Sequence, residues 1–332
     1  MSRDLHHGGA LDLMRERFPD VTAPWIDLST GINPWPYPDT DITPESLANL
    51  PTEAECLACR DAMARAIGAP KEAVVLAPGS ELLIRLLPEI INPRTVAVLS
   101  PTYGDHHAVW RRAGVEVIET ANPLDLADDV EAIVICNPNN PDGRIFSLEA
   151  LEETRAQLAR RGGWLIVDEA YGDLNPAQSL ASLGGSDGLI ILRSFGKFFG
   201  LAGLRLGALI APEDIRTTMM AHLGFWPVSG AALEIGIRAY ADLDWQAKIR
   251  TELSEALARL KTLLLAGSLD PVGSTQLFHY AKVEDAHSVW QHLAQHGIYV
   301  RRFDWSDCHL RIGLPANPEE EARLAAALSL SV

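Results

Sequence analysis

The stretch Ser194-Phe-Gly-Lys197-Phe-Phe-Gly-Leu-Ala-Gly-Leu-Arg205-Leu-Gly207 is the most informative part of this chain. It places a hydroxyl group three residues before a lysine and an arginine eight residues after that lysine. Ser194 and Arg205 can hold a phosphate through a hydroxyl hydrogen bond and a charge-assisted guanidinium contact, while the Lys197 amine can form a Schiff base with an aldehyde. Pyridoxal 5'-phosphate contains both groups, so the stretch predicts a site for this cofactor. Taken alone, the same residues also fit a glycine-rich loop that joins a strand to a helix.

Length, composition and charge limit the possible architectures and partners. The chain has 332 residues, of which 47% are hydrophobic, so it exceeds a usual single domain and can bury a large core. Its formal net charge of -16 and the lack of a lysine- and arginine-rich run argue against a nucleic acid as a partner. We expect two lobes and a small-molecule substrate.

The apolar segments of the chain are all short. Residues 1–9 lack the apolar run of a signal peptide, and no later segment reaches the unbroken apolar length needed to cross a bilayer. We therefore expect a cytoplasmic protein that does not contact a membrane.

Of the four cysteines, only Cys56 and Cys59 have the CxxC spacing of a redox or metal-binding pair. They lie in a helical pattern over residues 55–67, and no further pair of ligands is spaced to complete a zinc site. We expect structural thiols and no bound metal.

Residues 72–210 alternate apolar runs with helical patterns, which is typical of a parallel sheet covered by helices on both faces. The apolar runs are almost continuously hydrophobic, so we expect strands that are buried on both faces. They cover residues 74–77, 95–100, 116–119, 132–136, 164–167, 189–192 and 206–210. The pattern predicts an α/β fold whose large lobe contains a mostly parallel seven-stranded sheet between helices.

The pattern changes after Pro227. A long helix over residues 230–265 is followed by short strands near residues 276–281, 299–301 and 309–312, which predicts a smaller α+β lobe. The first 45 residues are rich in proline and turn residues, so we expect an arm that lies on the body of the protein. The predicted division is an N-terminal arm over residues 1–45 that covers the active site, a large cofactor-binding lobe over residues 46–227 and a small C-terminal lobe over residues 228–332.

Polar motifs follow several of the predicted strands, and open α/β sheets bind ligands at the carboxyl ends of their strands. Ala77-Pro-Gly-Ser80-Glu81 is a glycine turn that leads into a helix start, whose free amide groups suit a phosphate. Such a turn is also an ordinary helix cap. The segment Ser100-Pro-Thr-Tyr103 offers an aromatic ring that can stack on a pyridine ring, or an ordinary half-buried tyrosine.

The segment Trp164-Leu-Ile-Val-Asp168-Glu-Ala-Tyr171 gives the strongest support for the cofactor. A buried aspartate that faces a pyridine nitrogen keeps it protonated, because opposite charges at close range favour both ionised forms, and the cationic ring is an electron sink. Tyr171 can hydrogen-bond the phenolic oxygen of the ring, and so can Asn140 in the turn-dense loop CNPNNPDG of residues 136–143. An aspartate at the end of a strand is also a common structural residue.

Together these segments resemble the fold type I pyridoxal-phosphate enzymes, in the same order and along most of the chain. The resemblance implies that Lys197, Asp168 and Tyr171 are catalytic and that Lys197 carries the cofactor. It also implies that Arg311, in His309-Leu-Arg311-Ile-Gly-Leu-Pro, takes a substrate carboxylate through two parallel hydrogen bonds. The implied cofactor contacts are Ser80, Glu81, Ser194 and Arg205 for the phosphate, Tyr103 for stacking, Asn140 and Tyr171 for the phenolic oxygen O3', and Asp168 for the ring nitrogen.

Within this superfamily, the short chain and the Asn-Pro-Asn-Asn-Pro loop resemble the histidinol-phosphate aminotransferase branch, which includes the threonine-phosphate decarboxylases of cobalamin synthesis. The motifs His7-Gly8-Gly9 and IDLSTGINP of residues 26–34, with Asn33, are similar to the decarboxylase pattern, in which they line the substrate pocket. The resemblance implies decarboxylation of L-threonine O-3-phosphate to (R)-1-aminopropan-2-ol O-2-phosphate.

The substrate of such a reaction has a phosphate and a carboxylate. We expect Arg301 or Arg302, together with His7 and Asn33, to hold these groups so that the carboxylate leaves. Which arginine takes which anion stays open, and both arginines can also be solvated charges beside nearby aspartates.

Three positions depart from the family pattern. Asp142 stands where threonine is usual, and Gly196 replaces the common small hydroxyl residue beside the lysine. Leu50 stands where relatives carry a tyrosine that reaches the cofactor phosphate of the neighbouring subunit, so Leu50 cannot supply that bond. The resemblance still implies a homodimer.

Two alternatives remain. One is an aminotransferase for histidinol phosphate or an aromatic amino acid, in which Lys197 would move a proton from the α-carbon to the cofactor. The other is a non-catalytic binding protein or regulator that keeps the fold. The second alternative is weakened because the lysine, aspartate, tyrosine and arginine positions all carry the matching residues and no DNA-binding segment is appended.

Overall fold

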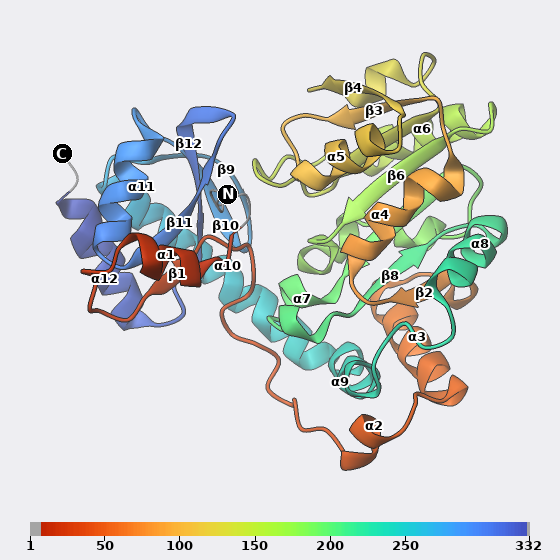
Figure 1. The fold of residues 1–332 in the computed structure, drawn as a ribbon, viewed down its shortest axis with the longest axis horizontal. Helices are drawn as coiled ribbons and strands as arrows, with labels where there is room; N and C mark the ends of the chain where they lie inside the picture. The colour runs from red at the N-terminus through yellow and green to blue at the C-terminus, as the bar shows by residue number, and fades with distance from the viewer. Residues whose placement is uncertain (1–7, 331–332) are drawn as a thin grey trace. The chain divides into compact units, whose positions relative to one another are not determined.

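The computed structural model describes residues 8–330, and the chain divides into two compact units (Figure 1). The seven-stranded unit comprises Pro36–Asn140 and Arg144–Gln246. The five-stranded unit comprises the described residues up to Trp35, Pro141–Gly143 and those from Ala247 onward. The expected arm over the active site, with lobe boundaries at residues 45 and 227, stays a prediction.

The seven-stranded sheet has the strand order β2-β8-β7-β6-β5-β3-β4 (Figure 1). The strands from β7 to β4 pair in parallel, whereas β8 is antiparallel to both of its neighbours. This confirms the predicted mostly parallel sheet, and the strand bounds are close to the expected ones. The strands are β2 (Val74–Ala77), β3 (Thr95–Leu99), β4 (Glu116–Thr120), β5 (Ala132–Cys136), β6 (Trp164–Glu169), β7 (Leu189–Ser194) and β8 (Gly207–Ile210).

One core cluster joins this sheet to three helices. Val134, Ile166 and Ile190 from the central strands pack with Leu83 and Trp110 from the helices. Each such side chain stabilises the fold by roughly 1.5–3 kcal/mol through removal of apolar surface from water. The three helices are α4 (Ser80–Ile91), α5 (Gly104–Arg112) and α8 (Glu213–Leu223).

The remaining helices of this unit lie before, within and after the sheet sequence. Helix α3 begins at a capping box, because the Thr52 side chain accepts from the Glu55 amide while the Glu55 carboxylate accepts from the Thr52 amide. Helix α9 packs against α3. These helices are α2 (Pro44–Ala48), α3 (Glu53–Ile67), α6 (Leu148–Ala159), α7 (Phe195–Phe198) and α9 (Gly230–Ala241).

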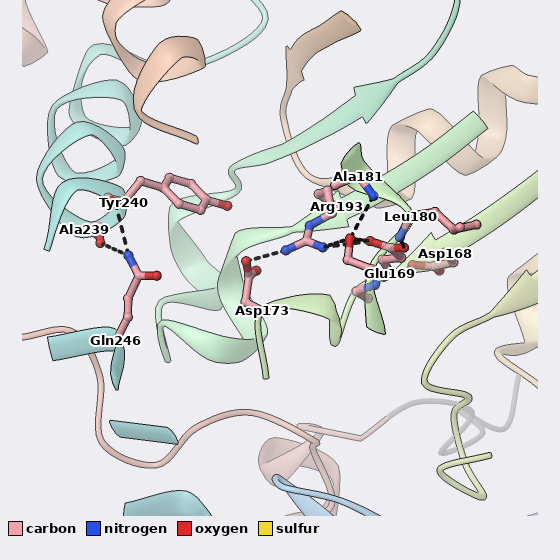
Figure 2. A network of polar contacts seen from close by, with 11 residues as sticks. Asp168, Glu169, Asp173, Leu180, Ala181, Arg193, Ala239, Tyr240 and Gln246 are labelled. Carbon is pink, nitrogen blue, oxygen red and sulfur yellow. Dashed lines mark hydrogen bonds and ion pairs between the residues drawn. The ribbon is translucent and has the colours of Figure 1, made fainter. Parts of the chain in front are cut away.

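The predicted long helix over residues 230–265 is wrong as a single element. It is two helices, α9 and α10 (Leu243–Ala266), which are separated at Asp242. The Asp242 carboxylate accepts a hydrogen bond from the Trp245 amide, and the Gln246 side-chain amide donates to the carbonyls of Ala239 and Tyr240 at the end of α9 (Figure 2). These side chains satisfy groups that a helix end leaves without partners, so the break is stable.

The five-stranded sheet has the order β1-β11-β12-β10-β9, in which β1 is parallel to β11 and the other pairs are antiparallel. The sequence did not predict β1 or β9, whereas the other three strands are close to the expected ranges. The elements of this unit are α1 (Leu11–Arg17), β1 (Ile26–Leu28), β9 (Asp270–Thr275), β10 (Phe278–Lys282), α11 (Ala286–Gln295), β11 (Ile298–Phe303), β12 (Ser306–Gly313) and α12 (Pro318–Ser329).

No helix among residues 8–330 is long and apolar enough to cross a membrane.

Candidate active site

A pocket of about 210 Å³ opens at the carboxyl ends of β5, β6 and β7 in the seven-stranded unit. All nine residues that the sequence predicted as cofactor contacts line it. The lining residues are Ser80, Glu81, Ile84, Tyr103, Cys136, Pro138, Asn140, Asp168, Ala170, Tyr171, Ser194, Lys197 and Arg205. The fold therefore gathers into one cavity motifs that are far apart in the sequence.

A buried acid that lines the pocket contacts a buried imidazole. Asp168, at the end of β6, is 4% exposed, and its Oδ2 lies 2.9 Å from Nε2 of His106, which is 1% exposed. The Ala170 amide donates to the other carboxylate oxygen at 3.0 Å. Burial opposes protonation of His106, but the neighbouring Cys136 and Asp168 outweigh it and raise the pKa of the imidazole to about 10. A cationic imidazole thus faces the Asp168 carboxylate.

His106 was not predicted from the sequence. It lies on the buried face of α5 with Val109 and Trp110, and it follows Tyr103 by one helical turn. The sequence did contain a signal for this residue: a histidine lies on an otherwise apolar helix face, one turn after a candidate stacking ring.

Cys136 on β5 lies near this acid and is in turn contacted by Thr102 in the loop before α5. The Cys136 thiol lies 3.9 Å from Asp168 Oδ2, and the Thr102 hydroxyl lies 3.2 Å from the same sulfur. The Thr102 hydroxyl also lies 2.7 Å from the Asn139 side-chain oxygen. The loop that contains Asn140 is therefore tied to the loop that contains Tyr103 next to the pocket.

Tyr103 lies at the N-terminal end of α5 and is held from two sides. Its hydroxyl lies 3.1 Å from Glu81 Oε2 and 3.0 Å from Asp105 Oδ2, and its ring meets the His106 ring edge-on at a centroid distance of 6.0 Å. Burial and these two carboxylates raise the pKa of the Tyr103 phenol above its usual range. The phenol stays protonated and donates to one carboxylate at a time, which fixes the ring at the pocket wall.

Another group of lining residues suits an anion. Ser80 and Glu81 form the first turn of α4, where backbone N–H groups and the helix dipole favour negative charge. Gly79 has φ +84, a conformation that favours glycine, and a Cβ there would lie 2.8 Å from Nη2 of Arg205, so the guanidinium lies close to the helix start. Ser194, at the end of β7, completes this group.

Lys197 projects from α7, a single turn that is anchored by aromatic packing. Phe195 and Phe199 stack at a centroid distance of 4.3 Å, and Phe199 also meets Tyr240 edge-on at 5.0 Å. A Cβ at Gly196 would lie 2.5 Å from Cα of Ala202, so the departure from the family's small hydroxyl residue has a steric cause. The backbone beside Lys197 is thereby fixed.

The predicted substrate residues that the structure describes all belong to the five-stranded unit. The Gly9 amide donates to the Ser29 hydroxyl at 2.8 Å, which fixes the Gly8-Gly9 segment next to β1. Asn33 is buried and its side-chain oxygen accepts from the Trp35 amide at 2.9 Å. His7 lies outside the described residues.

Two arginines stand directly opposite each other on neighbouring strands. Arg301 on β11 is the register partner of Arg311 on β12. Nη2 of Arg311 donates to the Ser29 carbonyl at 2.6 Å. Burial and repulsion from Arg311 lower the pKa of Arg301. The strands thus concentrate positive charge at one place on the sheet.

Arg302 has different surroundings, because successive residues of a strand point to opposite faces. Its guanidinium lies over the Trp290 ring of α11 at 5.8 Å and within 3.6 Å of the Asp304 carboxylate. These contacts support the alternative that Arg302 is a surface charge.

Comparison with known proteins places the chain in a family. The family model of aminotransferase class I and II matches residues 44–328. A threonine-phosphate decarboxylase of Pseudomonas aeruginosa is 39% identical over 98% of this chain and 97% of its own length, and one of a Sinorhizobium species is 36% identical over 99% of both. The solved histidinol-phosphate aminotransferase of Sinorhizobium meliloti, in complex with pyridoxal-5'-phosphate, is 19% identical with a TM-score of 0.83, over 96% of this chain and 93% of that one. These similarities confirm the predicted fold type I architecture, and the chain belongs to the aminotransferase class I and II family.

Proposed function

We propose that this protein is a pyridoxal-phosphate-dependent carboxy-lyase that converts L-threonine O-3-phosphate to (R)-1-aminopropan-2-ol O-2-phosphate and carbon dioxide in cobalamin biosynthesis. The observation that carries this proposal is the similarity, over essentially the full chain, to two threonine-phosphate decarboxylases. The pocket of the seven-stranded unit supplies independent chemical support.

The residues of the pocket fit pyridoxal phosphate. An amine, a buried carboxylate and an anion-binding helix start line the same cavity, and the glycine at position 79 leaves room for the Arg205 guanidinium beside that helix start. When bound, the cofactor withdraws electrons from the bond that breaks at the substrate α-carbon.

Asp168 would keep the ring nitrogen of the cofactor protonated. Its carboxylate is buried and faces His106, whose raised pKa keeps the imidazole cationic at neutral pH. A carboxylate close to the ring nitrogen favours the protonated form of that nitrogen, because opposite charges attract.

The other lining residues would hold the cofactor at its remaining edges. Tyr171 and Asn140 would contact its phenolic oxygen, and Tyr103 would stack on its ring. The amides of Ser80 and Glu81, with Ser194 and Arg205, would hold its phosphate. The Lys197 amine would bind the cofactor aldehyde and yield it to the substrate amine.

Recognition of the substrate would rest on the five-stranded unit. L-threonine O-3-phosphate has two anionic groups, and Arg301 and Arg311 offer two guanidinium groups at one place on a sheet. We assign the carboxylate to Arg311, and we assign support of the phosphate to Arg301 with His7, Gly8, Gly9 and Asn33. A substrate held through both anions presents its carboxylate for departure, and a proton then takes the place of the carboxylate at the α-carbon.

The proposal includes a homodimer in the cytoplasm. Leu50, where relatives carry a tyrosine, is 63% exposed and has no group that can bond to a phosphate. The subunits would therefore associate without that cross-subunit contact to the cofactor.

A second candidate function is histidinol-phosphate transamination. Its support is the similarity in fold to the aminotransferase of Sinorhizobium meliloti. Transamination removes the α-proton and keeps the carboxylate, so the two reactions release different products.

The test is incubation of the purified protein with pyridoxal phosphate and L-threonine O-3-phosphate, with no keto acid present. We expect stoichiometric carbon dioxide and the amine phosphate, and we expect no release from L-threonine because it lacks the second anion. Conversion of the cofactor to pyridoxamine phosphate by histidinol phosphate, without release of carbon dioxide from threonine phosphate, would move the protein to the aminotransferases.

A further inference from the structure

A buried cluster of charges lies at the ends of β6 and β7, and the proposed chemistry does not use it (Figure 2). Arg193 is 1% exposed and lies between two carboxylates. Its Nη1 donates to Glu169 Oε2 at 2.8 Å, and its Nη2 donates to Asp173 Oδ1. A guanidinium completely removed from water is costly unless it is paired in this way.

Glu169 connects the cluster to a third segment. Its Oε2 accepts from the Ser179 hydroxyl at 2.5 Å, and its Oε1 accepts from the Leu180 amide at 2.8 Å. The Ser179 hydroxyl in turn accepts from the Ala181 amide at 3.0 Å (Figure 2). The cluster thus joins β6, β7 and the turns that lie between them in sequence.

Each member of the central pair is the chain neighbour of a pocket residue. Glu169 follows Asp168, and Arg193 precedes Ser194, while Glu169 and Arg193 are register partners on the two strands. Successive strand residues point to opposite faces. The two strand ends therefore carry the pocket on one face and the charge cluster on the other.

The third member fixes the turn that carries Tyr171. Asp173 lies two residues after Tyr171 in the 3-10 turn Gly172–Leu174. A Cβ on Gly172 would lie 2.2 Å from Arg193 Nη1 and 3.0 Å from Glu169 Cβ, so the glycine makes room for the guanidinium. The turn is held against both strands through the cluster.

We propose that Arg193 is a positioning residue, whose guanidinium sets the spacing between the segments that carry Asp168, Tyr171 and Lys197. This inference rests on the proposed function, because these three residues are the ones assigned to the cofactor. Arg193 touches neither cofactor nor substrate in this role, and it acts through Glu169 and Asp173.

The first test compares the wild type with Arg193→Lys. A lysine ammonium keeps the charge but cannot bridge two carboxylates in one plane. We expect a folded protein with a weaker visible circular-dichroism band of the bound cofactor and a kcat lower by about 10- to 100-fold. We expect KM for L-threonine O-3-phosphate to stay within about twofold, because the arginine-bearing strands of the five-stranded unit are unaltered.

A second set of variants tests whether Arg193 positions the cofactor-binding segments or only stabilises the fold. Arg193→Met alone leaves two buried carboxylates without their cation, whereas the triple variant R193M, E169Q and D173N carries no charge in the cluster. We expect the triple variant to recover thermal stability relative to Arg193→Met but not the visible circular-dichroism band or kcat. Recovery of all three together would overturn the proposal, since the cluster would then act through stability alone.

Tyr240→Phe is the matched control. The Tyr240 side chain is as buried as Arg193, and its phenol points towards the cluster (Figure 2), but its hydroxyl has no hydrogen-bond partner among residues 8–330. We expect its cofactor band and kcat to match the wild type.

The two hypotheses fail in different ways. If wild-type protein releases no carbon dioxide from threonine phosphate, the proposed function fails, and the visible circular-dichroism comparison still decides the role of Arg193. If Arg193→Lys keeps the wild-type cofactor band and kcat, the role of Arg193 is refuted and the proposed function stands.

Discussion

The buried charges beside the pocket face opposite charges, whereas two arginines of the five-stranded unit face each other. In the seven-stranded unit, Asp168 faces His106, and Arg193 lies between Glu169 and Asp173. In the five-stranded unit, β11 and β12 set Arg301 directly opposite Arg311, and the pKa of Arg301 is lowered. In the first arrangement each cation faces a carboxylate, whereas in the second two cations face each other across neighbouring strands. The two units therefore place their buried or partly buried charges in different ways: opposite charges face each other in one, and like charges face each other in the other.

The largest effect is expected in the pocket, from removal of the Lys197 amine. In Lys197→Ala we expect loss of the visible absorbance of the lysine-bound cofactor and a decrease in kcat on the order of 10⁴-fold or more. Absorbance after dialysis and carbon dioxide release measure the two effects. Lys248→Ala, at an exposed lysine of α10, is the control, and full turnover in Lys197→Ala would refute the assignment of the amine.

The arginine side of the comparison is tested by Arg311→Lys. A bidentate contact to a carboxylate is lost while the charge remains, so we expect kcat/KM for L-threonine O-3-phosphate to fall about 10- to 100-fold. Arg302→Lys is the matched control, because its guanidinium lies over Trp290 and beside Asp304. Equal losses in the two variants would argue against a special role for Arg311.

A smaller effect is expected for Arg301→Met. Loss of one guanidinium should raise KM by about tenfold, while relief of a like-charge pair changes the unfolding free energy of the ligand-free protein by no more than about 1 kcal/mol. Steady-state kinetics and urea denaturation measure these quantities. A large loss of stability with unchanged KM would show that Arg301 serves the fold and not the ligand.

A pH dependence of stability is expected at the buried end of the pocket. The pKa of His106 is raised from its ordinary 6.5 to about 10. Below pH 6.5 the folded and unfolded chains both bind the proton, and the His106–Asp168 pair contributes fully. Between pH 6.5 and about 10 unfolding releases that proton, so the contribution falls as pH rises, by at most about 1.4 kcal/mol per pH unit.

The stability difference between wild type and His106→Gln should therefore shrink from pH 6 to pH 10. Urea denaturation of the cofactor-free proteins at several pH values measures it, with the exposed His296→Gln as the control. A difference that stays constant over this range would mean that His106 is neutral in the folded protein.

The sequence predicted the seven-stranded sheet because its strands are buried on both faces and therefore read as unbroken apolar runs. The same logic placed the pocket residues, since each motif directly follows such a run. Strand β9 could not be found this way, because Asp270-Pro-Val-Gly-Ser-Thr275 contains residues that are rare in strands and owes its conformation to pairing with β10. Strand β1 has only three residues and depends in the same way on β11.

The polar partners of the site were harder to predict than its motifs. His106 and Arg193 act through contacts with Asp168, Glu169 and Asp173, and those contacts exist only once the strands are in register. Local propensity indicates where a motif lies along the chain, but it carries no information on which charges meet across a sheet. The break at Asp242 was missed for a related reason, because apolar periodicity continues on both sides of it.

The pairing of β1 with β11 has a consequence for synthesis on the ribosome. Residues 26–28 leave the ribosome before any of the strand to which they bind has been translated, and about 270 residues separate the two partners. The whole sequence of the seven-stranded sheet is translated in that interval, so it can begin to fold first, because domains generally fold as units and N-terminal ones first. The opening segment of the chain must wait, unpaired, until the last strands emerge.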